Sequence, residues 1–268
     1  MAMVHRDSSS LLAIVIELGA EGNKFLPGTL GRALHSQVIG WIADVDAVLA
    51  EAIHTARDTP FTISPLFGNR RHGKPVVGES FFFRISLLQG SILPIILQGL
   101  ERWEDKSIVL GGHAFRLKAI YCLPGSHRWA GSSDYNLLSS LAIPQKEITL
   151  VFHTPTSFKQ KDFVQPFPLP DLVFGSLWRK WNSFCPADCK MEEEVWQVLV
   201  SGFDLQTRVY RLEGGAEIGC QGWVRYVFTE ERQARWGSVL SHFAFFAGVG
   251  RKTSMGMGLT RLRESYEQ

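Results

Sequence analysis

Apolar positions in the first part of the chain alternate between strand-like runs and helix-like periodicity. Leu11 to Leu18 is a leucine-rich and β-branched run of strand length. After Pro27, which the first turn of a helix tolerates, apolar residues recur at helical spacing at Leu30, Leu34, Val38, Trp41 and Val45. The pattern then predicts two strands, a helix and a strand, at Phe61 to Phe67, Phe81 to Leu88, Ile92 to Trp103 and His113 to Leu123. This order, β-α-β-β-α-β, is the ferredoxin-like arrangement.

The same order of elements is predicted again after a connection that contains glycine and serine, around Gly125 to Ser140. The second series runs through a strand at Glu147 to Phe158, a helix at Pro170 to Phe184, strands near Leu205 to Leu212 and Cys220 to Phe228, a helix at Glu230 to Phe246 and a last strand ending near Leu262. An additional amphipathic stretch, Glu192 to Val200, is extra to this order. We therefore predict an α+β fold with two tandem ferredoxin-like domains, at residues 1–140 and 145–268. The duplication rests on element order, because the halves share no convincing sequence repeat.

Composition limits the possible classes of protein. The chain has 268 residues, of which 45% are hydrophobic and 20% charged, so it can bury a sizeable core and is neither disordered nor fibrous. Its formal net charge is only +2, so a surface that binds phosphates would need its basic residues gathered on one side. The polar start and the short apolar run that follows fit neither a signal peptide nor a membrane span, and we expect a cytoplasmic protein without membrane contact.

Four cysteines are too few for a disulfide scaffold. Cys185 and Cys189 are close in sequence, but no second pair and no nearby histidine completes a zinc site. No partner for a cysteine nucleophile is visible either. We expect no bound metal and no cofactor.

The most unusual segment is glycine-rich and lies between the last predicted helix and the last predicted strand. It contains four glycines around two cations and a threonine: Gly248, Gly250, Arg251, Lys252, Thr253, Gly256 and Gly258. Glycine lets a backbone approach phosphate closely and expose its amides, and the cations supply counter-charge. A dinucleotide-binding motif would follow a strand and open a helix, and a Walker A motif would contain Gly-Lys-Ser/Thr, so neither fits. An enzyme that binds a nucleotide and acts on a small molecule stays as an alternative.

Three segments resemble one known family. The CRISPR-associated endoribonucleases that cut repeat transcripts into guide RNAs have a glycine-rich signature similar to FAFFAGVGRKTSMGMGLTR in this chain. The opening strand and helix of that family's second half resemble EITLVFHTPTSFKQK and LPDLVFGSLWRKWN. Together these segments cover most of residues 147–261. The resemblance implies two tandem ferredoxin-like (RRM-like) βαββαβ domains with a central RNA-binding cleft. It also implies that CRISPR repeat RNA, as a hairpin or single strand, is bound and cut once per repeat without metal.

The resemblance further implies a catalytic histidine on the first helix, where LPGTLGRALHSQVIGWI contains only His35. Helical spacing places His35 at the edge of the apolar stripe, Arg32 on a neighbouring face and Ser36 angularly near Arg32, so that all three could line one patch. RNA carries its own nucleophile, the ribose 2′-hydroxyl, so His35 could accept the hydroxyl proton or donate one to the leaving 5′-oxygen. Arg32 would stabilise charge on the phosphorane oxygens, with Ser36 as a hydrogen-bond donor. The expected products carry a 2′,3′-cyclic phosphate and a 5′-hydroxyl.

The cations that we expect to bind RNA lie mainly in the second half. They are Lys159, Lys161, Arg179, Lys180, Arg251 and Lys252, joined by Arg70, Arg71 and Lys74 in a loop that could grasp a hairpin stem. His54 and His153 are spare candidates for acid-base chemistry. Several relatives pair the histidine with a tyrosine and a lysine, whereas no tyrosine occurs here before Tyr121. A catalytically silent module that binds repeat RNA is therefore the main alternative. The sequence leaves open whether the protein is a monomer or a homodimer and whether it joins a CRISPR effector complex.

Overall fold

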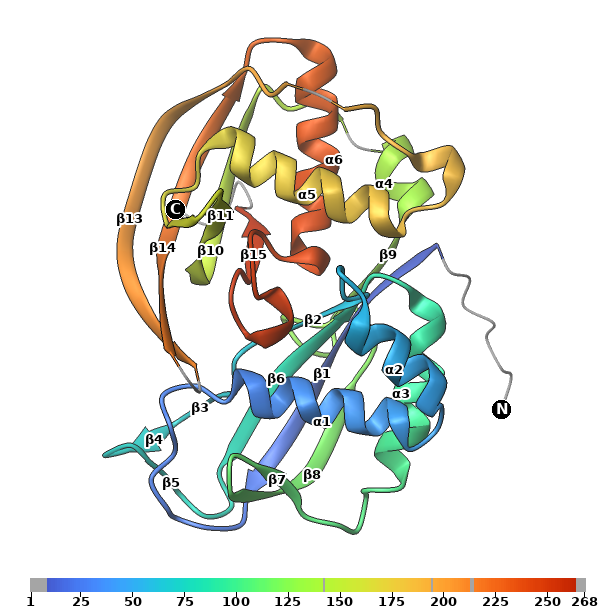
Figure 1. Ribbon diagram of the computed structural model, residues 1–268, viewed down its shortest axis with the longest axis vertical. Helices are drawn as coiled ribbons and strands as arrows, with labels where there is room; N and C mark the ends of the chain where they lie inside the picture. Colours follow the sequence, from blue (N-terminus) through green and yellow to red (C-terminus); the bar gives the residue numbers. More distant parts are fainter. Residues whose placement is uncertain (1–8, 142, 194, 213–214, 264–268) are drawn as a thin grey trace.

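The chain forms two α+β halves stacked along the long axis of the molecule (Figure 1). The computed structural model describes residues 9–263 except 142, 194 and 213–214. The main strands of the first sheet have the order β2-β6-β1-β8-β7, and those of the second sheet have the order β13-β14-β10-β15. In both sheets the first long strand of the half lies between the third and fourth main strands, which is the ferredoxin-like arrangement. The predicted tandem ferredoxin-like fold is confirmed.

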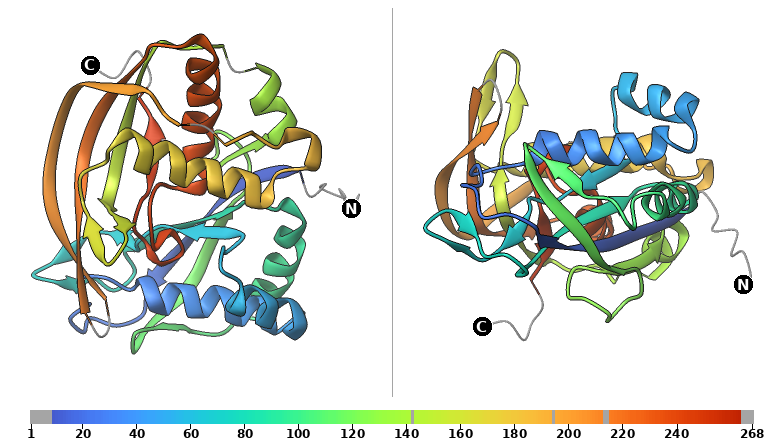
Figure 2. Two further views of the ribbon diagram at one scale, coloured as in Figure 1. Left: turned by 45° about the horizontal axis from the view of Figure 1, so that its top comes forward. Right: turned by 90° about the horizontal axis from the view of Figure 1, so that it is seen from below.

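The first half contains most of the short strands. Its strands are β1 (Ser10–Ala20), β2 (Phe61–Ile63), β3 (Phe67–Gly68), β4 (Arg70–Arg71), β5 (Lys74–Pro75), β6 (Ser80–Leu87), β7 (Ile108–Leu110), β8 (His113–Tyr121) and β9 (Gly131–Asp134). Its helices are α1 (Gly31–Ala43), α2 (Ala47–Thr55), the 3-10 turn η1 (Gly90–Ile92) and α3 (Leu93–Glu101). The view from below shows α1 and α2 on one side of β1 (Figure 2, right).

The second half follows α4 (Tyr135–Leu141), which leads out of the first sheet. Its strands are β10 (Glu147–Thr156), β11 (Phe158–Gln160), β12 (Phe163–Gln165), β13 (Val198–Leu212), β14 (Gly215–Phe228) and β15 (Thr260–Leu262). Its helices are α5 (Pro170–Phe184), the 3-10 turn η2 (Ala187–Cys189), α6 (Glu231–Ala247) and the 3-10 turn η3 (Thr253–Met255). The long hairpin of β13 and β14 reaches down from the second half to the first (Figure 1).

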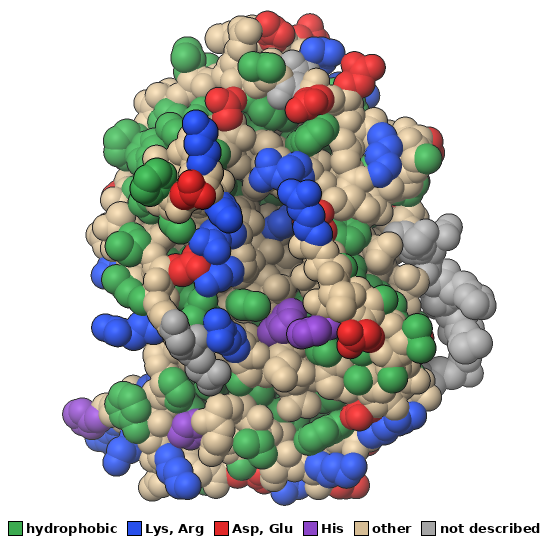
Figure 3. Space-filling view, in the orientation of Figure 1, with side chains coloured by type: hydrophobic (Ala, Val, Ile, Leu, Met, Phe, Trp, Pro, Cys, Tyr) green, Lys and Arg blue, Asp and Glu red, His purple; other side chains and the backbone are tan. Residues whose placement is uncertain are grey.

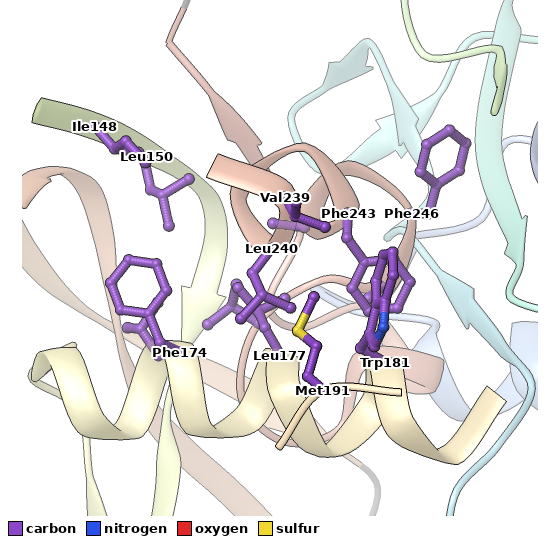
Figure 4. Close-up of a cluster of buried hydrophobic side chains, with 14 of the residues drawn as sticks. Ile148, Leu150, Phe174, Leu177, Trp181, Met191, Val239, Leu240, Phe243 and Phe246 are labelled. Atoms are coloured by element: carbon purple, nitrogen blue, oxygen red, sulfur yellow. The ribbon is translucent and has the colours of Figure 1, made fainter. Parts of the chain in front are cut away.

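Alternation along the strands explains how each sheet buries one face under its helices. In β1, the side chains of Ile14, Ile16 and Leu18 share a core with Leu34 and Trp41 of α1. In the second half, Leu150 of β10 and Phe174 of α5 belong to the other large core, in which the ring of Trp181 meets that of Phe243 edge to face at 5.2 Å (Figure 4). These two cores fix α1 and α5 on their sheets, and both helices border the candidate site.

Several predicted elements need correction. The strand expected at Phe61 to Phe67 is split into β2 and β3, because Pro65 between them has no N–H to donate to a ladder. Val45 lies beyond α1, and Asp46 begins the unpredicted α2 by accepting a hydrogen bond from the amide of Leu49 at 2.9 Å. The stretch Glu192 to Val200 is not a separate element: its described residues are irregular until β13 begins at Val198.

The segment predicted as a plain connection, Gly125 to Ser140, contains β9 and α4. Strand β9 pairs antiparallel with β1 in the first sheet. Tyr135, at the start of α4, lies in the core of the second half, with its ring 4.9 Å from that of Trp181. The two halves therefore share this segment, and the division at residues 140 and 145 stays a prediction.

A buried arginine also joins the halves. Arg84 of β6 is 2% exposed, and its Nε donates to Trp129 O at 3.0 Å while its Nη2 donates to Phe245 O, at the end of α6, at 2.5 Å. Its guanidinium lies over the ring of Phe245, 4.1 Å from the centroid. Burial lowers the pKa of Arg84 to about 9. The negative end of the α6 dipole favours a cation at this position.

Candidate nucleic-acid interface

The glycine-rich segment forms a compact loop between the halves, at the end of α6 (Figure 1). Its backbone is bonded to its surroundings: Gly250 N–H donates to Ser176 Oγ at 3.1 Å, Arg251 N–H to Ser157 O at 3.0 Å and Gly258 N–H to Pro155 O at 3.1 Å. These amides are therefore occupied by the protein itself. The expectation that the glycines leave the loop's amides open to phosphate is not met at these three positions.

The glycines are explained by the geometry of the loop. Gly258 has a φ of 71°, and a Cβ placed on it would lie 2.1 Å from Val249 O. Gly250 has a φ of 79°, and its Cβ would lie 2.3 Å from Ser157 O. Gly248 and Gly256 also have positive φ angles. Only glycine fits such positions without strain, so the four glycines build the loop and leave its side chains as the groups available to a ligand.

A basic hollow of about 420 Å³ lies beside this loop. It is lined from both halves, by Arg57, Asp58, Thr59, Lys159, Lys180, Phe184, Gly250, Arg251, Lys252, Thr253 and Ser254. The surface view shows Lys and Arg side chains gathered around a hollow at mid-height, with histidine below it (Figure 3). The fold thus brings together four of the cations predicted to bind RNA, and it adds Arg57, which the sequence pattern did not single out.

Lys180 holds the loop in place. Its Nζ donates to Ala247 O at 2.8 Å and to Thr253 Oγ1 at 2.9 Å, so it joins the last residue of α6 to η3. Burial lowers the pKa of this ammonium group to about 7, and nearby Asp58 opposes the shift. Lys180 lies on α5, at one side of the hollow, so the loop is held by a side chain from a different element.

The other predicted cations of the second half are placed differently. Lys161 is exposed in the tight turn between β11 and β12, with a φ of 53°. Arg179 is exposed on α5 and does not line the hollow. In the first half, Arg70 Nη1 donates to Pro27 O at 2.8 Å, while Arg71 and Lys74 are exposed on the β4–β5 hairpin that projects from the molecule (Figure 1).

An acidic residue that the sequence did not indicate meets the two cations of the loop. Glu217 of β14 forms ion pairs with Arg251, at 3.3 Å between Oε2 and Nη1, and with Lys252, between Oε1 and Nζ. Its side chain is only 11% exposed. Arg251 and Lys252, the loop cations that we expect to bind phosphate, are thus already paired with a carboxylate.

His35 meets the glycine-rich loop from α1. Its Nδ1 donates to Ser254 O at 3.3 Å, which leaves Nε2 as the proton acceptor of a neutral ring. Burial lowers the pKa of His35, and the charge of His54 lowers it further, while the hydrogen bond to Ser254 raises it. His54, at the end of α2, is therefore near enough to interact electrostatically with His35. The ring of Phe61 supports His35 at 5.6 Å.

A tyrosine lies near this histidine, although it comes from the second half. Tyr210 of β13 donates its hydroxyl to Met255 O at 2.9 Å, on the residue after the one that binds His35. Burial raises the pKa of Tyr210. Because Tyr210 and His35 lie on different halves, sequence order gave no signal of this approach.

Arg32 and Ser36 lie on another side of α1. They line a separate hollow of about 560 Å³ together with Gly40, Trp103 and Gly111. On a helix these two residues lie about 60° and about 100° around the axis from His35. The structure therefore brings Arg32 and Ser36 together, on a face next to that of His35. His153 packs edge-on against Trp129, with ring centroids 4.9 Å apart.

Within residues 9–263, apart from the four positions left out, no group of three or more His, Cys, Asp or Glu side chains could hold a metal ion. Over the same residues, no helix has both the length and the apolar character that crossing a bilayer requires.

The comparisons by sequence match part of the chain. The family model described as CRISPR-associated endoribonuclease Cas6 matches residues 150–260, which include the loop and α5. A Cas6 endoribonuclease of Streptococcus thermophilus is 26% identical over 126 residues, or 45% of this chain and 52% of that protein, so the match spans about half the length of this curated relative.

Solved structures extend the likeness over both halves. A Cas6 (TTHA0078) substrate mimic complex is 30% identical, with a TM-score of 0.73, over 96% of this chain and 100% of the other. A product complex of Cas6 (TTHA0078) is 29% identical, with a TM-score of 0.77, over 95% and 100%. A Thermus thermophilus Cas6 (TTHB231), in a product complex, shares the fold with a TM-score of 0.81 at 24% identity, over 95% and 100%. Because the substrate mimic complex is 30% identical over nearly the whole of both chains and the family model matches the second half, the chain belongs to the CRISPR-associated Cas6 family.

Proposed function

We propose that this protein is an endoribonuclease that binds CRISPR repeat RNA across the cleft between its halves and cuts it beside His35. The observation that carries the proposal is the meeting of His35 with Ser254 of the glycine-rich loop, at the border of the basic hollow. Lys159, Arg251 and Lys252 would bind the phosphates there. An RNA strand held by these cations would pass close to the imidazole.

The proposed chemistry needs no metal ion. His35 is neutral at pH 7 because its pKa lies below the ordinary value, and its free Nε2 would accept the proton of the ribose 2′-hydroxyl. The 2′-oxygen then attacks the adjacent phosphorus, and the bond to the 5′-oxygen breaks. The imidazolium formed in the first step can return its proton to that 5′-oxygen. The products would be a 2′,3′-cyclic phosphate and a 5′-hydroxyl.

Arg32 and Ser36 would act on the RNA beyond His35. They line the neighbouring hollow on α1, so a strand that continues over this helix meets a guanidinium and a hydroxyl. Arg32 would stabilise negative charge on the phosphate oxygens, and Ser36 would donate a hydrogen bond. The exposed Arg71 and Lys74 on the β4–β5 hairpin would contact the backbone of a stem, and Lys161 and Arg179 would extend the basic surface from the second half.

The test is cleavage of a labelled CRISPR repeat in the presence of a chelator. We expect one cut per repeat. The upstream fragment should carry a terminal phosphate monoester only after acid has opened its cyclic phosphate. A requirement for added Mg²⁺ would refute the mechanism. Tight binding of the repeat without any cleavage product would instead support the alternative, a catalytically silent module that binds repeat RNA.

A further inference from the structure

We propose that Glu217 is a built-in competitor of RNA, a carboxylate that occupies the phosphate-binding cations of the glycine-rich loop until a well-matched RNA displaces it. The inference rests on the proposed function and adds to it a residue that limits the affinity of the same site for RNA. In the free protein, Glu217 pairs with both Arg251 and Lys252. A phosphate that binds these cations must therefore take the place of a carboxylate rather than of mobile counterions.

The geometry makes Glu217 part of the cleft. It lies on β14 opposite Tyr210 of β13, in the hairpin whose far end reaches the first half (Figure 1). Tyr210 bonds the loop at Met255 O, so both strands of the hairpin touch the loop, one through a hydroxyl and one through a carboxylate. The hairpin thus delivers the carboxylate to the cations at a fixed position.

The pairing is incomplete, which favours exchange. Glu217 Oε2 is buried and forms no hydrogen bond among the described residues, although Arg251 lies within ion-pair distance. A buried carboxylate oxygen without a hydrogen bond is poorly compensated for the loss of water. A phosphate group offers more acceptor oxygens than a carboxylate and binds a guanidinium in the same two-pronged manner. The cations can therefore change partner without any movement of the hydrogen-bonded backbone of the loop.

The consequence is discrimination between RNAs. An unrelated strand has only its phosphates to offer and has to displace Glu217 with them. A cognate repeat gains additional contacts from its bases and shape, which offset this cost. Because both RNAs bear the same cost of displacement, removing the carboxylate should strengthen the binding of both by a similar factor. Unrelated RNA should then bind at concentrations at which only the repeat binds the wild type.

Salt dependence provides an independent measure. Each phosphate that neutralises a free cation releases counterions, and for single strands the slope of log K against log salt changes by about 0.7 per phosphate. These counterions come from the RNA, so the slope counts the neutralised phosphates whether or not the cation was paired with Glu217 beforehand. We expect Glu217→Gln to have the same slope as the wild type, because the same phosphates are neutralised in both. A slope steeper by about 0.7 to 1.4 would mean that one or two phosphates fail to displace Glu217 in the wild type.

The experiment measures equilibrium binding of the CRISPR repeat and of an unrelated single-stranded RNA of equal length, over a range of KCl concentrations. The variants are Glu217→Gln and, as a matched control with the same change in net charge, Glu192→Gln, whose carboxylate is exposed and pairs with Arg232 at 3.9 Å. Glu217→Asp keeps the charge but shortens the side chain, and it provides a second test if the glutamine variant does not fold. We expect Glu217→Gln to bind unrelated RNA about tenfold more tightly, with a similar gain for the repeat, and Glu217→Asp to change in the same direction.

The outcomes separate the inference from the proposed function. Weaker or unchanged RNA binding by folded Glu217→Gln, relative to Glu192→Gln, would show that Glu217 only positions the cations and would overturn the inference alone. A steeper salt slope for Glu217→Gln would do the same, because it would show that RNA leaves Glu217 in place in the wild type. If neither the wild type nor any variant binds the repeat better than unrelated RNA, the proposed function itself fails.

Discussion

Replacing His35 by alanine should separate catalysis from binding. The neutral imidazole contributes no charge to phosphate binding at pH 7, because burial and His54 lower its pKa. The variant loses one hydrogen bond, to Ser254 O, worth about 0.5–1.5 kcal/mol, and the packing of the ring on Phe61. RNA affinity should therefore fall by less than about tenfold. Loss of a general base should slow cleavage by about 10²–10⁴-fold, or roughly 2.7–5.5 kcal/mol of transition-state stabilisation.

The assay is single-turnover cleavage of the labelled repeat at saturating protein, with filter binding and thermal melting of the same samples. Saturation removes the effect of a modest loss of affinity, so the rate reports the chemical step. Parallel losses of rate and affinity would refute the reasoning and make His35 an RNA-positioning residue. A cleavage rate within a few-fold of the wild type would exclude it from the mechanism.

The pH dependence of the same rate tests the role of the imidazole. A base with a lowered pKa gives a rate that rises with pH and levels off, with a midpoint below the ordinary value of about 6.5. The limb should be absent from His35→Ala. In the matched control His54→Ala, the midpoint should move up towards 6.5, because a positive charge near His35 has been removed, and the plateau should stay unchanged. A falling limb in place of the rising one would assign His35 the acid role.

Four further outcomes are expected. A single 2′-deoxy nucleotide at the cleavage position should abolish the cut and leave affinity nearly unchanged, and normal cleavage of that RNA would reject attack by the 2′-hydroxyl. The Gly258→Ala variant should lose about 2 kcal/mol or more of stability, from its positive φ and the approach to Val249 O, whereas Gly28→Ala, with open space around it, should melt like the wild type. Arg84→Lys should lower stability by about 1.5–3 kcal/mol in denaturant titrations, because an ammonium group cannot reproduce the two bonds to Trp129 O and Phe245 O. Below pH 6.5 the wild type should lose stability because His35 protonates less readily in the folded state, and His35→Ala should show a smaller loss of melting temperature over that range.

Elements with strong local signals could be predicted from the sequence. The predicted helix at Pro170 to Phe184 coincides with α5, since Pro170 suits a first turn and Val173, Phe174, Leu177 and Trp181 recur at helical spacing on the buried face. The tandem ferredoxin-like order followed from the same kind of pattern. The segment from Gly125 to Ser140 gave no such signal, because β9 exists only through its pairing with β1.

The site was predicted only in part. Its glycine-rich loop and the helix bearing His35 were visible in the sequence because both are local patterns. The pairing of Glu217 with Arg251 was not, since it depends on how a long hairpin crosses to a distant loop. The positions of Arg32 and Ser36 relative to His35 required the packing of α1 on its sheet, which sets the face of the helix that meets the loop.

The segment that joins the halves has a consequence for how the protein can be divided. Its β9 completes hydrogen bonds of β1, and its Tyr135 fills a place beside Trp181. A break within residues 125–130 would leave a carboxy-terminal fragment that contains both β9 and Tyr135. This fragment could still pair with β1 of the amino-terminal fragment. Two such fragments, produced together in one cell, should reassemble without a covalent link, whereas shortening the second fragment to begin after α4 should prevent their association.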